Sequence, residues 1–201
     1  MIKGTKNWAD RGTFSVQTNN AIETILHKKL PVGADGIPHG WLEDCGPTAA
    51  INILDAMGHP TETKSPAGWA PQPEDVLACW FNDPRNYGAM VRPGVDPAKF
   101  LGNEIPQWYP AALAAVFGVS ARYLEGQTFD WMATIVQGGA GAMICLKDPG
   151  HFLAVVAYDD ETKELIYRDS WPGRTKTDGF NLRMGRAEWS ANVNPFLILI
   201  S

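Results

Sequence analysis

Apolar side chains recur at helical spacing through the first two thirds of the chain. Just after Cys45, and before Gly58, they follow the i, i+3, i+4, i+7 pattern of an amphipathic helix. These residues are Ala50, Ile53, Leu54 and Met57. Similar patterns predict further helices at 18–30, 73–81, 107–118 and 128–136. We therefore expect this part of the chain to be mainly helical.

The pattern changes near residue 142 to short apolar runs that are typical of strands. The predicted strands are 142–146, 151–158, 164–169, 183–189 and 194–200. A polar loop at 159–163 joins the second and third of them into a hairpin. Helices followed by strands indicate an α+β fold. We expect one domain over 1–201, with a helical N-terminal lobe (about 1–137) packed on a C-terminal antiparallel β-sheet lobe (about 138–201).

Composition and charge exclude several classes of protein. A chain of 201 residues with 45% hydrophobic content can bury a substantial core. The net charge of −5 and the absence of a long basic cluster argue against binding to nucleic acid. The N-terminus lacks the apolar stretch of a secretory signal or a membrane span. We expect synthesis in the cytoplasm without a signal peptide, and no insertion into membranes.

The cysteines indicate free thiols. Cys45, Cys79 and Cys145 are odd in number and show no C-x-x-C spacing, which disfavours a disulfide framework and a structural zinc site. Cys79 and Cys145 lie within apolar runs and are expected in the core. We predict no metal site.

Cys45 differs from the other two cysteines because it stands where a loop becomes a helix. It lies in the segment Asp44-Cys45-Gly46-Pro47-Thr48. The unpaired N–H groups of a helix start favour a thiolate and can lower a thiol pKa of about 8.5 toward neutrality. The flanking turn residues favour a position at the surface. The alternative is that Cys45 is an ordinary buried cysteine.

The predicted hairpin brings a histidine close to a carboxylate. His151 opens one strand and Asp169 closes its partner, so their Cβ atoms should lie about 5 Å apart. A carboxylate there could bind one imidazole nitrogen while the other faces a nucleophile. The alternative is an exposed or core-capping histidine. Of the other histidines, only His39, shortly before Cys45, keeps a functional possibility.

Three motifs together resemble a known family. Asp44–Thr48 is similar to the nucleophile motif of the papain-like peptidases of the bacteriocin-processing (double-glycine) type and of their stand-alone bacterial and phage relatives. Gly150–Phe152 resembles their histidine motif, and Asp169–Pro172 resembles their acidic motif. The last motif is also similar to the Asn-Ser-Trp of papain, with Asp in place of Asn. The resemblance extends from Gln17 to Trp171 and implies a papain-like fold.

The resemblance implies a role for each matching residue. Cys45 would be the nucleophile, His151 the general base and acid, and Asp169 the group that orients the imidazole. Trp171 would shield the His–Asp pair from water. No metal or organic cofactor is implied.

The second donor of the oxyanion hole has two candidates. In the family a glutamine upstream of the cysteine donates to the oxyanion together with the cysteine backbone N–H. Gln17 matches that glutamine, but it lies further upstream of Cys45 than in papain, and an insertion with a helix must be assumed. The alternative donor is His39, and Gln17 could equally be a surface residue.

The implied function is that of a cysteine peptidase that hydrolyses amide bonds through a thioester. The substrate would be a peptide, with the peptide of bacterial peptidoglycan as target if the protein is a phage-type lytic enzyme (endolysin). Such an enzyme would be released from the host cell or carried by a phage. The alternatives are a catalytically inactive papain-like binding module and a transglutaminase-like acyl transferase. The sequence leaves the oligomeric state open.

Overall fold

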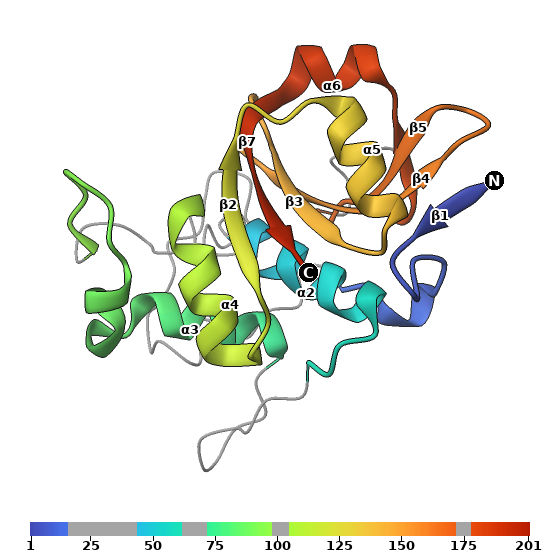
Figure 1. Ribbon diagram of the computed structural model, residues 1–201. Helices are drawn as coiled ribbons and strands as arrows, with labels where there is room; N and C mark the ends of the chain where they lie inside the picture. The colour runs from blue at the N-terminus through green and yellow to red at the C-terminus, as the bar shows by residue number, and fades with distance from the viewer. Residues whose placement is uncertain (16–43, 62–71, 98–104, 172–177) are drawn as a thin grey trace, which may run out of the picture.

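The computed structural model describes residues 1–15, 44–61, 72–97, 105–171 and 178–201, which form one antiparallel sheet and the helices around it (Figure 1). The strands are β1 (Ile2–Gly4), β2 (Ala121–Glu125), β3 (Gly141–Leu146), β4 (Phe152–Asp159), β5 (Glu164–Arg168), β6 (Leu182–Met184) and β7 (Val193–Ile200). The α-helices are α2 (Cys45–Met57), α3 (Pro73–Asn82), α4 (Tyr109–Phe117), α5 (Phe129–Gln137) and α6 (Arg186–Asn192). Short 3-10 helices are η1 (Arg11–Thr13), η4 (Pro84–Ala89) and η7 (Pro106–Trp108).

The sheet takes its strands from distant parts of the chain. Their order is β2-β7-β3-β4-β5-β6, and β1 pairs with β4 outside this path. β3 pairs with residues 152–155 of β4, and β1 pairs with residues 157–159. The N-terminal strand therefore extends the sheet where the pairing of β3 with β4 ends.

Helix α2 is the central helix, and nearly all of its residues are buried. It packs against β3, β4 and α3. A close approach to β3 is possible because residue 141 is a glycine: a Cβ atom there would lie only 2.3 Å from Cγ2 of Ile53. The helix ends at Gly58, whose φ of 73° is in the left-handed region.

Two hydrophobic clusters cover the two faces of the sheet. One joins α2, α3 and α4 to the sheet and includes Leu77, Leu113 and Ile198. The other joins α5 and α6 to the sheet and includes Met132 and Trp189. Figure 1 shows the same division, with α2, α3 and α4 gathered on one side and α5 and α6 on the other.

Most of the predicted elements within the described residues are confirmed. The predicted helices near 73–81, 107–118 and 128–136 correspond to α3, to η7 with α4, and to α5. The hairpin is β4 with β5, and the α+β class is confirmed. The helix predicted at 18–30 lies outside the described residues.

The predicted strand at 183–189 is wrong. Only Leu182–Met184 forms a strand, β6, and the chain then turns at Gly185 into helix α6. The helix buries Trp189 against the ring of Phe129, at a centroid distance of 6.1 Å. The same buried aromatic residue would have fitted a strand pattern, so periodicity could not separate the two.

Two short strands were not predicted. β1 and β2 belong to the sheet although they come before residue 138 in the chain. The sheet is therefore not confined to residues 138–201, the limits expected for the sheet lobe. Strand β2 has only partly buried or exposed side chains, and it includes the charged Arg122 and Glu125, so it has no continuous apolar run.

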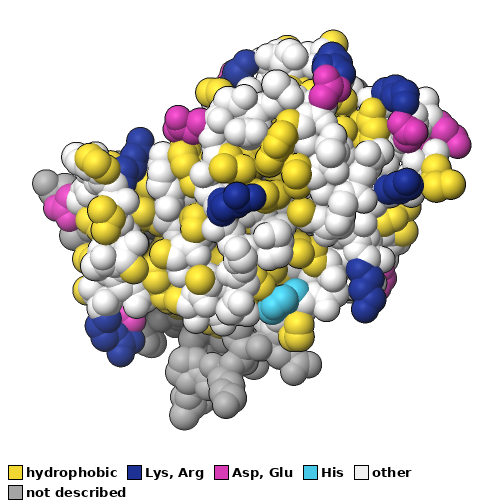
Figure 2. Space-filling view, viewed as in Figure 1, with side chains coloured by type: hydrophobic (Ala, Val, Ile, Leu, Met, Phe, Trp, Pro, Cys, Tyr) yellow, Lys and Arg dark blue, Asp and Glu magenta, His cyan; other side chains and the backbone are white. Residues whose placement is uncertain are grey.

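The surface visible in Figure 2 mixes charges of both signs with hydrophobic side chains. No helix in the described parts of the chain is long and apolar enough to span a membrane.

Candidate active site

The Cys45 sulfur lies at the start of α2, beside the first residue of β4. Thr48 closes the first turn of the helix, since its amide and hydroxyl both donate to the carbonyl of Asp44, at 3.0 and 2.8 Å. The Phe152 amide donates to Sγ of Cys45 at 3.5 Å. Phe152 directly follows His151, so the helix start and the histidine strand meet at the sulfur.

His151 and Asp169 form a buried hydrogen-bonded pair. Nε2 of the imidazole lies 2.7 Å from Oδ1 of Asp169, and the two side chains are 2% and 0% exposed. The register of β4 and β5, in which Ala154 faces Arg168, brings the two strand ends together. When Nε2 donates to the carboxylate, a neutral imidazole carries its lone pair on Nδ1, which can then accept a proton.

Backbone contacts also hold Asp169 in place. The Trp171 amide donates to Oδ1 at 3.0 Å, and the Asp169 amide donates to the Gly179 carbonyl at 2.8 Å. The Trp171 ring packs edge-on against the His151 ring, at a centroid distance of 5.6 Å. Trp171 thus covers the imidazole from one side.

The environment of Cys45 differs from the one expected from its neighbours in sequence. The residue is 6% exposed, although Asp44, Gly46 and Pro47 favoured a surface turn. Burial raises the pKa of the Cys45 thiol to about 12, although the amides of Phe152 and Gly46 act to lower it. The expected shift toward neutrality is therefore wrong for this state, because the loss of solvation outweighs the helix start.

The other expected site residues are only partly accounted for. Gln17 and His39, the two candidates for the oxyanion hole, lie outside the described residues. Cys145 is buried in β3 as expected, and Cys79 is half-buried in α3. Both are free thiols, and burial raises their pKa values.

Sequence reasoning missed the structural contacts that surround the pair. The Phe152 amide at the sulfur and the Gly179 carbonyl at Asp169 are backbone groups, which no side-chain motif marks. Within the described ranges, no group of three or more His, Cys, Asp or Glu side chains could hold a metal ion.

A thiol at a helix start accepts from the amide that follows a histidine, and that histidine pairs with a carboxylate where two adjoining strands end; this is the arrangement of papain-like proteins. Within that class, the model of the Peptidase_C39 like family matches residues 27–194. The chain therefore belongs to this family, which confirms the resemblance to peptidases of the bacteriocin-processing type.

Two solved structures of this family are similar to the chain. One is described as a C39-like peptidase from Bacillus anthracis, with 13% identity and a TM-score of 0.35 over 47% of this chain and 57% of that one. The chain thus matches little more than half of that protein. The other is the N-terminal peptidase C39 like domain of the toxin secretion ATP-binding protein from Vibrio parahaemolyticus, with 15% identity and a TM-score of 0.37 over 63% of this chain and 94% of that one. A comparison with curated proteins found no match.

Proposed function

We propose that this protein is a cysteine peptidase that hydrolyses amide bonds with Cys45 as nucleophile, His151 as general base and acid, and Asp169 as the orienting group. One observation carries the proposal: His151 and Asp169 form a buried 2.7 Å contact, and the amide of Phe152, the residue after His151, donates to the Cys45 sulfur. Membership of the Peptidase_C39 like family supports the same reaction class.

The first half of the reaction follows from the protonation states of the site. The thiol holds its proton at neutral pH because burial raises its pKa to about 12. Nδ1 of His151 takes this proton as the sulfur attacks the carbonyl carbon of the substrate. The backbone N–H of Cys45 donates to the oxyanion, together with Gln17 or, alternatively, His39. The imidazolium then protonates the leaving amine as the C–N bond breaks.

The second half releases the acyl group from Cys45. His151 removes a proton from water, which attacks the thioester, and the C–S bond breaks. The products are a carboxylic acid and the regenerated thiol. Asp169 accepts from Nε2–H throughout and stabilises the transient imidazolium.

The proposed substrate is a peptide, and the peptide part of bacterial peptidoglycan is the first to test. The stand-alone relatives that the chain resembles include phage lytic enzymes, so the proposed enzyme would be made in the cytoplasm and released at lysis. The net charge of −5 does not favour binding to an anionic cell envelope. Substrate recognition would then depend on local contacts around Cys45 rather than on overall charge.

The test compares variants on purified peptidoglycan and on a peptide library. We expect Cys45→Ala and His151→Ala to abolish turnover and Asp169→Ala to leave a small residual rate, each with a native circular dichroism spectrum. Cys79→Ala is the matched control, because it removes another free thiol that lies in α3, and should keep full activity. Full turnover by His151→Ala would contradict the assignment.

Burial of the sulfur favours a second candidate function, a papain-like binding module without catalysis. Its basis is the 6% exposure of Cys45 and the raised pKa of its thiol. Such a module would bind peptide or peptidoglycan equally well with Cys45 or Ala at this position, and would release no product. Product formed by the wild type but not by Cys45→Ala would exclude it.

A further inference from the structure

Arg168 is a buried cation that the proposed reaction does not use. It is the last residue of β5, directly precedes Asp169, and is completely buried. Among the described residues, its guanidinium donates to backbone carbonyls of the N-terminal residues and of α2. They belong to Asn7 (3.2 Å), Trp8 (3.0 Å), Asp10 (3.3 Å) and Asn52 (3.3 Å). One side chain thus joins β5 both to the N-terminal residues and to helix α2.

The charge of Arg168 is kept despite its burial. Burial lowers the pKa of Arg168 to about 10, while the carboxylates of Asp55 and Asp10 act to raise it. This value is well above neutrality, so the guanidinium stays positive at neutral pH. A buried cation is costly unless hydrogen bonds satisfy it. The planar, five-donor guanidinium can reach several carbonyls at once, which a lysine cannot do.

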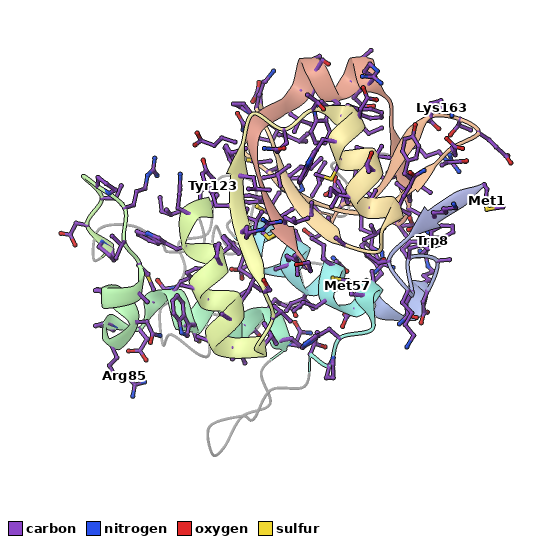
Figure 3. The ribbon with its side chains drawn as sticks, in the orientation of Figure 1. Met1, Trp8, Met57, Arg85, Tyr123 and Lys163 are labelled. Carbon is purple, nitrogen blue, oxygen red and sulfur yellow. The ribbon has the colours of Figure 1, made fainter. Side chains whose placement is uncertain are left out.

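Residues 1–15, here called the N-terminal arm, are fastened along this part of the molecule. The Asn7 amide donates to the Ala56 carbonyl near the end of α2, at 2.6 Å. Figure 3 shows Trp8 on the stretch that leads from β1 toward this end of α2. Further along, Asn52 accepts from the Ser15 amide at 2.8 Å and donates to the Ser15 carbonyl at 3.0 Å. The arm is therefore held at both ends of its path across α2.

Phe180 and the preceding Gly179 form a second connection between Arg168 and Asp169. The Phe180 ring lies 5.2 Å from the Arg168 guanidinium and 5.6 Å from the ring of Phe14 in the N-terminal arm. The preceding Gly179 accepts from the Asp169 amide at 2.8 Å. It must be glycine, because φ is +82° and a Cβ atom would lie 2.1 Å from the Asp169 carbonyl oxygen.

We propose that Arg168 is a positioning residue that holds Asp169 against His151. It ties the N-terminal arm and α2 to the end of β5, and it supports Phe180, whose neighbour Gly179 binds the Asp169 backbone. The carboxylate is thereby fixed at Nε2 of the imidazole. The effect on turnover rests on the proposed function, whereas the effect on the imidazole does not.

The test uses the full chain with Arg168→Lys, which keeps the positive charge but loses the planar fork. We expect the kcat of this variant to fall about tenfold or more with little change in KM, since a small displacement of a catalytic group costs rate rather than binding. A second readout is the NMR resonance of the His151 Nε2 proton, assigned with His151→Gln. In the wild type this proton should give a low-field signal, and its hydrogen bond to the Asp169 carboxylate should slow its exchange with water. In Arg168→Lys the signal should move upfield and the proton should exchange faster.

A second variant and a matched control keep the test decisive. Phe180→Leu removes the ring contact while leaving Arg168 in place, and should give a smaller change of the same kind even if Arg168→Lys folds poorly. Arg183→Lys is the control, because Arg183 bonds Asp159 and Glu164 at the opposite end of β4 from His151. It should leave kcat and the imidazole signal unchanged.

Each outcome bears on one of the two proposals. Native folding of Arg168→Lys and Phe180→Leu with an unchanged imidazole signal would overturn the positioning role. Undiminished turnover by Cys45→Ala would overturn the peptidase proposal, while the imidazole signal would still test Arg168.

Discussion

Two opposite effects act on the sulfur of Cys45. The amides of Gly46 and Phe152 stabilise a thiolate, as expected at a helix start, but burial removes water from the sulfur. The second effect is larger, and the pKa of the thiol rises to about 12. In the proposed reaction, Cys45 would therefore start as a thiol that must lose its proton to His151 during attack, rather than as a thiolate already formed in the resting protein.

This electrostatic balance predicts a slow, strongly pH-dependent alkylation of Cys45. Because the folded protein holds the proton up to about pH 12, iodoacetamide should label Cys45 more slowly than a free cysteine at pH 7, and the rate should keep rising above pH 9. Peptide mass spectrometry separates this label from that on half-buried Cys79. Labelling of Cys45 at pH 6 that is faster than labelling of free cysteine would show a thiolate instead.

At the residue scale, sequence reasoning found the groups whose spacing fixes their distance. His151 and Asp169 could be paired in advance because a hairpin places the two strand ends side by side. Arg168 could not be recognised, because its partners are backbone carbonyls some 160 residues away and on α2. No side-chain pattern in the sequence marks a backbone carbonyl as a partner, so contacts of this kind can be recognised only once the fold is known.

At the scale of elements, α3 repeats the conflict seen at the start of α2. Glu74 lies in the first turn of α3, where the helix dipole favours a carboxylate. It is only 2% exposed, and burial raises its pKa to about 7, with Asp75, Asp44 and Asp55 adding to the shift. At both helix starts, the loss of solvation raises the pKa of the buried group by more than the helix dipole lowers it.

The raised pKa of Glu74 predicts that Glu74→Gln stabilises the protein near neutral pH. The folded state prefers the protonated carboxyl, so its stability falls as the pH rises from the ordinary value of 4.5 through about 7. The substitution should raise the free energy of unfolding by at most about 3 kcal/mol at pH 8, with no gain at pH 4. Urea unfolding at both pH values measures this difference.

The control for Glu74 is Glu188→Gln, in the first turn of α6. Glu188 is exposed, so this change removes the same charge from the same kind of position without burial. It should alter the free energy of unfolding by less than about 0.5 kcal/mol at either pH. A Glu74→Gln variant that is less stable than the wild type at pH 8 would contradict the prediction.

Elements were predictable where periodicity was unambiguous. The apolar spacing of α2 and α5, with Gly58 and Thr128 at their ends, specified helices that the structure contains. The stretch at 183–189 failed because its buried Trp189 suits either a strand or one turn of helix. Contact with Phe129 of α5 decides between them, and this contact is not visible in local sequence.

At the scale of the whole molecule, helices α2, α3 and α4 share one hydrophobic cluster with the sheet. The same cluster contains Leu77 of α3, Leu113 of α4, Met143 of β3 and Ile198 of β7. Strands β1 and β2 come from the part of the chain that was expected to be helical. A helical lobe and a sheet lobe that share their core in this way should not unfold separately.

We therefore predict one cooperative unfolding transition for the chain. Calorimetry should give a ratio of calorimetric to van't Hoff enthalpy near one, and near-UV and far-UV circular dichroism should change at the same temperature. Gly141→Ala probes the contact between the lobes, because the new Cβ atom would lie 2.3 Å from Cγ2 of Ile53 in α2. The substitution should lower the free energy of unfolding by about 1–3 kcal/mol, and the variant should still unfold in a single transition.

A matched change away from this contact is Gly88→Ala in η4, where a new Cβ atom meets nothing within 4 Å. This substitution should leave the midpoint temperature of unfolding nearly unchanged. If the helical signal were lost before the near-UV signal, or if Gly141→Ala split the transition in two, the lobes would be separate folding units. The proposed triad would then depend on docking between two bodies, since Cys45 belongs to α2, whereas His151 and Asp169 directly flank β4 and β5 of the sheet.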